Sequence, residues 1–190
     1  MLEAVNVSKS FDGREVLRHF SVKLEDGGRY CLMGPSGCGK TTLLNLMMGL
    51  LKPDSGAIRM PAGTKLSAVF QENRLLDQMT AAANVALVSP APRAQIEALL
   101  LQLGLDEESL TLPVSAFSGG MKRRVALCRA LLAEFDILFL DEPYKGLDEE
   151  TRARVMALVN ERTRGKTVLL VTHDREETDG YTPISLGMEA

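Results

Sequence analysis

The 190-residue sequence contains no tryptophan and only three cysteines, and aromatic residues make up 5% of it. Cys31, Cys38 and Cys128 are too few and too widely spaced for a disulfide framework. They also lack the short paired spacing that a zinc site needs. A reducing compartment is therefore expected.

Long apolar runs and a charge excess are missing too. No uninterrupted apolar run approaches the roughly 18 residues of a membrane span. The first ten residues lack the basic start and apolar core of a signal peptide. Lys and Arg number 22 against 25 Asp and Glu, a net charge of -3, which gives no general attraction to nucleic acid. We expect one compact domain that does not cross a membrane alone, and no nucleic-acid partner.

Apolar residues alternate with polar ones over residues 2–7 and 20–24, which predicts strands with one solvated face and an antiparallel lobe over about 1–28. Compact apolar runs predict parallel strands buried on both faces. These runs are 29–33, 67–70, 136–140 and 167–171. The sequence therefore predicts an α/β fold with a core over about 29–71 and 134–190.

A helical lobe over about 72–133 is predicted between two of these core strands, because much of it carries no strand signal. Within it, residues 93–103 place Ile96, Leu99, Leu100 and Leu103 on one helical face, and Gly104 supplies a C-terminal stop. We interpret this leucine face as core packing.

The segment GPSGCGKTT follows one predicted strand and precedes an apolar helical run. This strand, glycine-rich loop and helix are the context of a phosphate-binding loop, in which backbone N–H groups and a helix N-terminus face the phosphate oxygens. Lys40 is expected to reach the β- and γ-phosphates of ATP, Thr41 to ligate Mg²⁺ and Thr42 to bind the α-phosphate. The nucleotide-binding residues expected here are Gly34, Pro35, Ser36, Gly37, Cys38, Gly39, Lys40, Thr41 and Thr42. Cys38 occupies a variable position.

The segment ILFLDEP places two carboxylates where a buried strand ends, the edge at which open α/β sheets bind ligands. Asp141 is expected to hold Mg²⁺, and Glu142 to orient and deprotonate the attacking water. The alternative is a pair of solvated loop residues. The combination with the phosphate loop favours the catalytic interpretation.

The segment FSGGMKRRVALCRAL (117–131) resembles the ABC signature motif, and the chain from about residue 2 to 174 resembles the ABC ATPase family. Phe117 stands where the family has leucine. Met121 replaces the usual glutamine, as in the nitrate, sulfonate and taurine importer branch. The resemblance assigns Ser118, Gly119 and Gly120 to nucleotide binding, whereas a plain capped helix is the structural alternative.

Four further residues match the family in order. The resemblance implies that Phe11 stacks on adenine, that Gln71 senses Mg²⁺ and couples lobes, that Asp148 contacts the second subunit, and that His173 contacts the γ-phosphate. Each has an ordinary alternative: a core aromatic, a surface amide, a helix N-cap and a structural histidine. His19 has no such context and is expected on a solvated face.

The resemblance implies one P-loop NTPase domain over residues 1–190 that carries the signature in its helical lobe. A second copy, or a homologous ATPase subunit, would complete each ATP site. Membrane-spanning permease subunits are the implied partners, a solute-binding protein is an optional one, and the location is the cytoplasmic face of the cell membrane. The short segment after His173 is expected to leave no room for an added regulatory domain.

The implied function is ATP hydrolysis coupled to transport, with import the preferred direction. A soluble ABC ATPase that remodels nucleic acid or ribosomes is an alternative. Such proteins commonly carry paired ATPase domains or basic extensions, which are not seen here. A signalling module without turnover is a third hypothesis. The presence of both Glu142 and His173 disfavours it.

Overall fold

The computed structural model describes residues 1–35 and 37–186. The chain forms two compact units. The first comprises Met1–Leu66, Asp136–Asp141 and the described residues from Gly165 on, and the second comprises Ser67–Phe135 and Glu142–Arg164. The boundaries of the three expected lobes stay a prediction.

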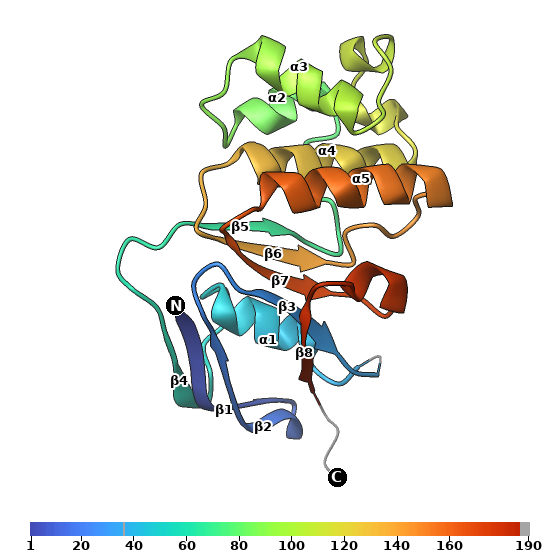
Figure 1. Ribbon diagram of the computed structural model, residues 1–190. Helices are drawn as coiled ribbons and strands as arrows, with labels where there is room; N and C mark the ends of the chain where they lie inside the picture. Colours follow the sequence, from blue (N-terminus) through green and yellow to red (C-terminus); the bar gives the residue numbers. More distant parts are fainter. Residues whose placement is uncertain (36, 187–190) are drawn as a thin grey trace. The chain divides into compact units, whose positions relative to one another are not determined.

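The first unit contains a parallel sheet in the order β6-β7-β3-β8 (Figure 1). Its strands are β3 (Arg29–Met33), β6 (Ile137–Asp141), β7 (Thr167–Val171) and β8 (Thr182–Ser185). All residues of β6 and β7 are buried, which explains their continuous apolar sequences. Since the strands are parallel, their carboxyl ends share one edge of the sheet. The segments that follow β3, β6 and β7 therefore start at that edge.

A second, antiparallel sheet of the first unit has the order β2-β1-β4. Its strands are β1 (Leu2–Phe11), β2 (Arg14–Leu24) and β4 (Ser55–Arg59). Leu2, Ala4 and Val7 of β1 are buried, while the residues between them, Glu3, Val5 and Asn6, are at least partly exposed. This alternation is the pattern expected of a sheet with one solvated face. Helix α1 (Lys40–Met47) buries Leu43, Leu44, Leu46 and Met47 in the same unit.

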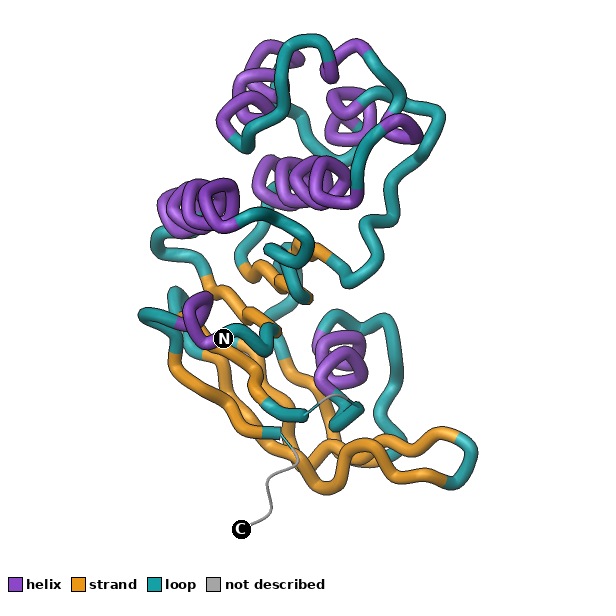
Figure 2. The backbone as a smooth tube through the Cα atoms, turned by 90° about the vertical axis from the view of Figure 1, so that its right-hand side faces the viewer, coloured by secondary structure: helices purple, strands orange, loops and turns teal. Residues whose placement is uncertain are grey.

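The second unit is mainly helical (Figure 2). Its helices are α2 (Ala81–Ala86), α3 (Arg93–Gln102), α4 (Gly119–Leu132) and α5 (Glu149–Arg162), with short 3₁₀ turns at 109–111 and 114–116. Helices α2, α3 and α4 pack against one another. Ile96, Leu99, Leu100 and Leu103 are almost fully buried, so the predicted core role of the leucine face is confirmed.

The predicted α/β fold class is confirmed. The apolar runs at 29–33 and 167–171 coincide with β3 and β7, and those at 67–70 and 136–140 differ by one residue from β5 (Leu66–Val69) and β6. The sequence did not predict β4 or β8, which are short strands with partly exposed residues. Weak burial removes the apolar pattern that announces a strand.

No helix among the described residues is long and apolar enough to cross a membrane.

Candidate functional site

The phosphate loop connects β3 to α1, as predicted. Gly39 caps α1 in a left-handed conformation with φ 98°. A Cβ added there would come within 2.9 Å of Val16 Cγ1, so both backbone conformation and space require glycine. The helix start is thereby held close to β2. Ser36 lies outside the described residues.

The Lys40 ammonium is held inside this loop. Its Nζ donates to Gly34 O at 2.7 Å and to Pro35 O at 2.8 Å, and it lies 3.9 Å from Cys38 Sγ. A lysine ammonium has three donors and is a compact point charge. The loop therefore holds the Lys40 ammonium at a position where it could contact a phosphate bound in the loop.

Thr41 and Asp141, which are 100 residues apart, meet at the sheet edge. Thr41 Oγ1 donates to Asp141 Oδ2 at 3.2 Å, and Asp141 is only 5% exposed. A hydroxyl and a carboxylate are hard oxygen donors of the kind that Mg²⁺ prefers, with phosphate oxygens and water completing its coordination. The residues present therefore fit the Mg²⁺ site expected from the sequence. Thr42 is half-buried in the same helical turn.

Glu142 directly follows Asp141 and has a left-handed backbone, with φ 48°. A non-glycine residue in this region is uncommon, and such strain is concentrated at functional sites. Its Oε2 accepts from Lys145 Nζ at 2.8 Å. The carboxylate is thus held by an ion pair within the turn that leads to α5.

His173 and Phe11 are both exposed residues of the first unit. His173 follows β7 and buried Thr172, whose Oγ1 accepts from Asp174 N at 3.1 Å. This bond fixes the chain around the histidine. Phe11 ends β1 and is 42% exposed, with Lys9 Nζ 5.5 Å from its ring centroid. An exposed ring is available for stacking, and the core alternative for Phe11 is wrong.

The signature segment opens α4. Ser118 is the N-cap, and its Oγ accepts from Met121 N at 3.2 Å. Ser118 and Gly119 are exposed. A Cβ on Gly120 would lie 3.0 Å from Gly146 O, so glycine allows the signature turn to pack closely on the segment that precedes Asp148.

Asp148 caps α5, since its Oδ1 accepts from Thr151 N at 2.9 Å. This bond holds the pKa of the Asp148 carboxyl below its ordinary value. The N-cap alternative is therefore confirmed, and the intersubunit role stays a prediction. Gln71 is exposed, and its backbone carbonyl accepts from Arg123 Nη2 at 2.5 Å.

Of the expected site residues, the described structure joins Thr41 to Asp141 and Lys40 to its own loop. Two partners were missed by sequence reasoning. Arg123 was given no role from the sequence, and it is only 5% exposed. Lys145 was given no role from the sequence either, although its spacing of three residues from Glu142 could have suggested an ion pair.

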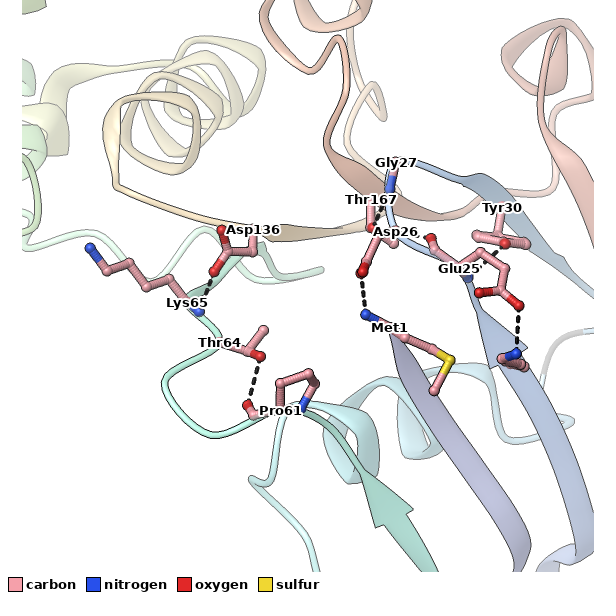
Figure 3. Close-up of polar contacts among 11 residues, drawn as sticks. Met1, Glu25, Asp26, Gly27, Tyr30, Pro61, Thr64, Lys65, Asp136 and Thr167 are labelled. Carbon is pink, nitrogen blue, oxygen red and sulfur yellow. Dashed lines mark hydrogen bonds and ion pairs between the residues drawn. The ribbon is translucent and has the colours of Figure 1, made fainter.

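A cavity of about 280 Å³ lies elsewhere in the first unit, at the amino ends of β6 and β7. Figure 3 shows its polar contacts: the Met1 ammonium donates to Asp26, and Asp136 Oδ2 accepts from Lys65 N at 2.9 Å. The charged groups there already pair with one another. Ligands of such sheets bind at the carboxyl ends instead, so we assign the functional site to the phosphate-loop edge.

A family profile and two curated relatives that match this chain concern ABC transporters or import ATP-binding proteins. A protein-family profile described as "ABC transporter" matches residues 17–145. The chain is 34% identical to the spermidine/putrescine import ATP-binding protein PotA of Fusobacterium nucleatum, over 93% of this chain and 51% of PotA. It is 40% identical to the aliphatic sulfonates import ATP-binding protein SsuB 1 of Streptomyces avermitilis, over 90% of this chain and 66% of that protein.

A solved structure is also similar. It is the dimeric post-hydrolysis state of the ATP-binding cassette MJ0796 bound to ADP and Pi, with a TM-score of 0.87 and 28% identity. The match covers 98% of this chain and 94% of that one. By contrast, the chain spans about half the length of the first curated relatives it matches.

Proposed function

The chain belongs to the ABC transporter family, and we propose that it is the subunit that binds and hydrolyses ATP. The observation that carries this proposal is the 3.2 Å hydrogen bond between Thr41 and Asp141. It brings the first residues of the phosphate-loop helix to the carboxylate that precedes Glu142. That combination suits a nucleotide–metal substrate better than a nucleotide alone.

Lys40 and the loop N–H groups would hold the β- and γ-phosphates. Thr41 and Asp141 would hold Mg²⁺, which supplies positive charge opposite the developing negative charge of the transferred phosphoryl group. Phe11 would stack on the adenine, consistent with its exposed ring. The chain thus provides a contact for each chemical part of the substrate.

Glu142 would accept the proton of the attacking water, and His173 would position the water and the γ-phosphate. Glu142 follows a buried strand and has a strained backbone, both of which restrict where its carboxylate can lie. His173 follows the neighbouring strand β7. The products are ADP and phosphate.

A second copy, or a homologous subunit, would cap the nucleotide with its Ser118, Gly119 and Gly120. The exposure of Ser118 and Gly119 leaves them available to a partner. The dimeric state of the MJ0796 cassette with ADP and Pi supports this arrangement. Since hydrolysis would remove the γ-phosphate contact across the interface, dimer closure and opening would follow the ATP cycle.

The names of both curated relatives support import as the direction of transport. Permease subunits would then receive the motion through the helical lobe near Gln71, at the cytoplasmic face of the membrane, with a solute-binding protein as an optional partner. One relative is a polyamine importer subunit and the other a sulfonate importer subunit. The solute would therefore be chosen outside this chain, and the sulfonate branch is one candidate.

The test compares Glu142→Gln with Lys40→Ala by size-exclusion chromatography and phosphate release, with ATP and Mg²⁺. Glu142→Gln should bind ATP, lose hydrolysis and accumulate as a dimer, because an amide cannot take the proton of water. Lys40→Ala should lose nucleotide affinity and stay monomeric. Turnover at the wild-type rate in Glu142→Gln would remove Glu142 from the catalytic role.

A further inference from the structure

Arg123 in the signature helix is a buried cation that holds the backbone next to Gln71. The residue is 5% exposed. Its Nη1 donates to Phe70 O at 2.6 Å, and its Nη2 donates to Gln71 O at 2.5 Å. The planar guanidinium matches two adjacent carbonyls as a fork, which a lysine ammonium does not reproduce.

A second arginine on the same helix holds two further carbonyls of the same segment. Arg129 Nη1 donates to Arg74 O at 2.7 Å, and its Nη2 donates to Asn73 O at 3.0 Å. The segment 70–74 is therefore anchored to α4 at two separate points of the helix.

The amino end of α4 is tied to the same part of the chain. Lys122 Nζ forms an ion pair with Asp77 at 3.0 Å, and Ser118 caps the helix one turn earlier. The exposed Gln71 side chain thus projects from a backbone that is anchored to the helix that begins with the signature. Each of these contacts lies within the second unit.

We propose that Arg123 is a positioning residue that fixes the Gln71 backbone to the signature helix. A movement of this helix when the second subunit engages Ser118 would then also move Gln71, and so change its Mg²⁺-dependent role. This inference rests on the proposed function. Arg123 acts through the Phe70 and Gln71 carbonyls and does not itself touch the substrate. Arg129 holds the neighbouring carbonyls without reaching Gln71, and so provides a matched control.

The experiment measures ATP hydrolysis by the full chain as free Mg²⁺ is varied at saturating ATP. Arg123→Met keeps an unbranched side chain that matches the arginine stem and removes the guanidinium donors. It should lower the maximal rate by about tenfold, which corresponds to about 1.4 kcal/mol in the barrier, and raise the Mg²⁺ concentration at half-maximal rate. Arg129→Met should lower the melting temperature similarly and leave the Mg²⁺ dependence unchanged.

If Arg123→Met does not fold, Arg123→Lys takes its place, because it keeps the charge but not the planar fork that bonds two adjacent carbonyls, and it should show the same shift at smaller size. A folded Arg123 variant with wild-type rate and Mg²⁺ dependence overturns the proposal, as does an equal Mg²⁺ shift in Arg129→Met. Gln71→Ala and the double variant Arg123→Met/Gln71→Ala distinguish the role of Gln71 from the positioning role of Arg123. If Arg123 acts through Gln71, the double variant should be no worse than Gln71→Ala.

Failure of the proposed function would look different. Wild-type Mg²⁺ dependence in Gln71→Ala would remove the role of Gln71, and the positioning role of Arg123 with it. A defective Gln71→Ala beside a normal Arg123→Met would overturn only the positioning role.

Discussion

Lys145 Nζ lies 2.8 Å from Oε2 of Glu142, so the proposed general base is held by a cation three residues downstream. The Lys145 side chain is 56% exposed and that of Glu142 is 20% exposed. An ion pair with one solvated partner is worth at most about 1 kcal/mol. It can therefore hold the carboxylate in place and still open when the site is used.

Replacement of Lys145 by alanine should raise turnover by no more than about fivefold. The reason is that Glu142 would no longer have to break its ion pair with Lys145 before it contacts the attacking water. Steady-state phosphate release at saturating ATP measures this. Lys166→Ala is the control, since Lys166 is also exposed and lies 3.9 Å from a carboxylate oxygen of Asp136, at the other end of β6. A large fall in the Lys145→Ala rate would instead mean that the lysine supports the reaction.

His173→Ala should reduce turnover far more than ATP affinity, because its proposed contacts matter most when charge develops on the γ-phosphate. The variant should fold, since His173 is exposed and the adjacent hydrogen bond is made by Thr172 and Asp174. Nucleotide binding and hydrolysis are measured on the same preparation. Unchanged hydrolysis in a folded variant would return His173 to a structural role.

A mixture of two inactive variants should regain activity if each ATP site is shared. Lys40→Ala would remove the proposed phosphate contact and Ser118→Arg would block the proposed signature face, so each homodimer would have two damaged sites. In a mixed dimer, one site carries both defects and the other carries neither. Some ATPase activity should therefore return on mixing, although coupling between sites limits its size. Full activity of a Ser118→Arg homodimer would contradict the shared site.

The three cysteines should differ in reactivity. Burial raises the pKa of the Cys31 thiol from 9.0 to about 11 and that of Cys128 to about 12. Only the thiolate is nucleophilic, so iodoacetamide at pH 8 should label the half-buried Cys38 first. ATP with Mg²⁺ should slow that labelling if Cys38 lies in the nucleotide loop, and mass spectrometry of peptides measures both effects. Equal labelling of all three would contradict it.

The same shifts set the sign of a pH effect on folding. Because both folded-state pKa values exceed 9.0, the unfolded thiols ionise first as pH rises past about 9. The contribution of these thiols to the free energy of unfolding is therefore complete below pH 9 and lost as pH rises through the folded-state values. Urea titrations at pH 8 and 10 measure the difference, and equal stability would argue against it.

Several features of the site were predictable because they depend on neighbours in the chain. The phosphate loop follows β3, Asp141 ends β6, and Ser118 and Asp148 cap helices as their residue types favour. Strands β3 and β7 contain compact apolar runs with clear ends. Each of these predictions needs only a few consecutive residues. The chemical roles of Glu142, Gln71 and His173 stay predictions.

The sequence by itself determined that a glycine-rich loop lies between a strand and a helix, the context of a phosphate-binding loop, because loop, strand and helix are all local structures. Only the tertiary structure decided that Thr41 meets Asp141 and that Arg123 reaches the Gln71 carbonyl, 100 and 52 residues away. Such contacts depend on how strands align and helices pack, and a local pattern does not contain that information. From sequence alone, a charged residue in a helix such as Arg123 is expected to face solvent, and only the tertiary structure shows that it is buried against backbone carbonyls.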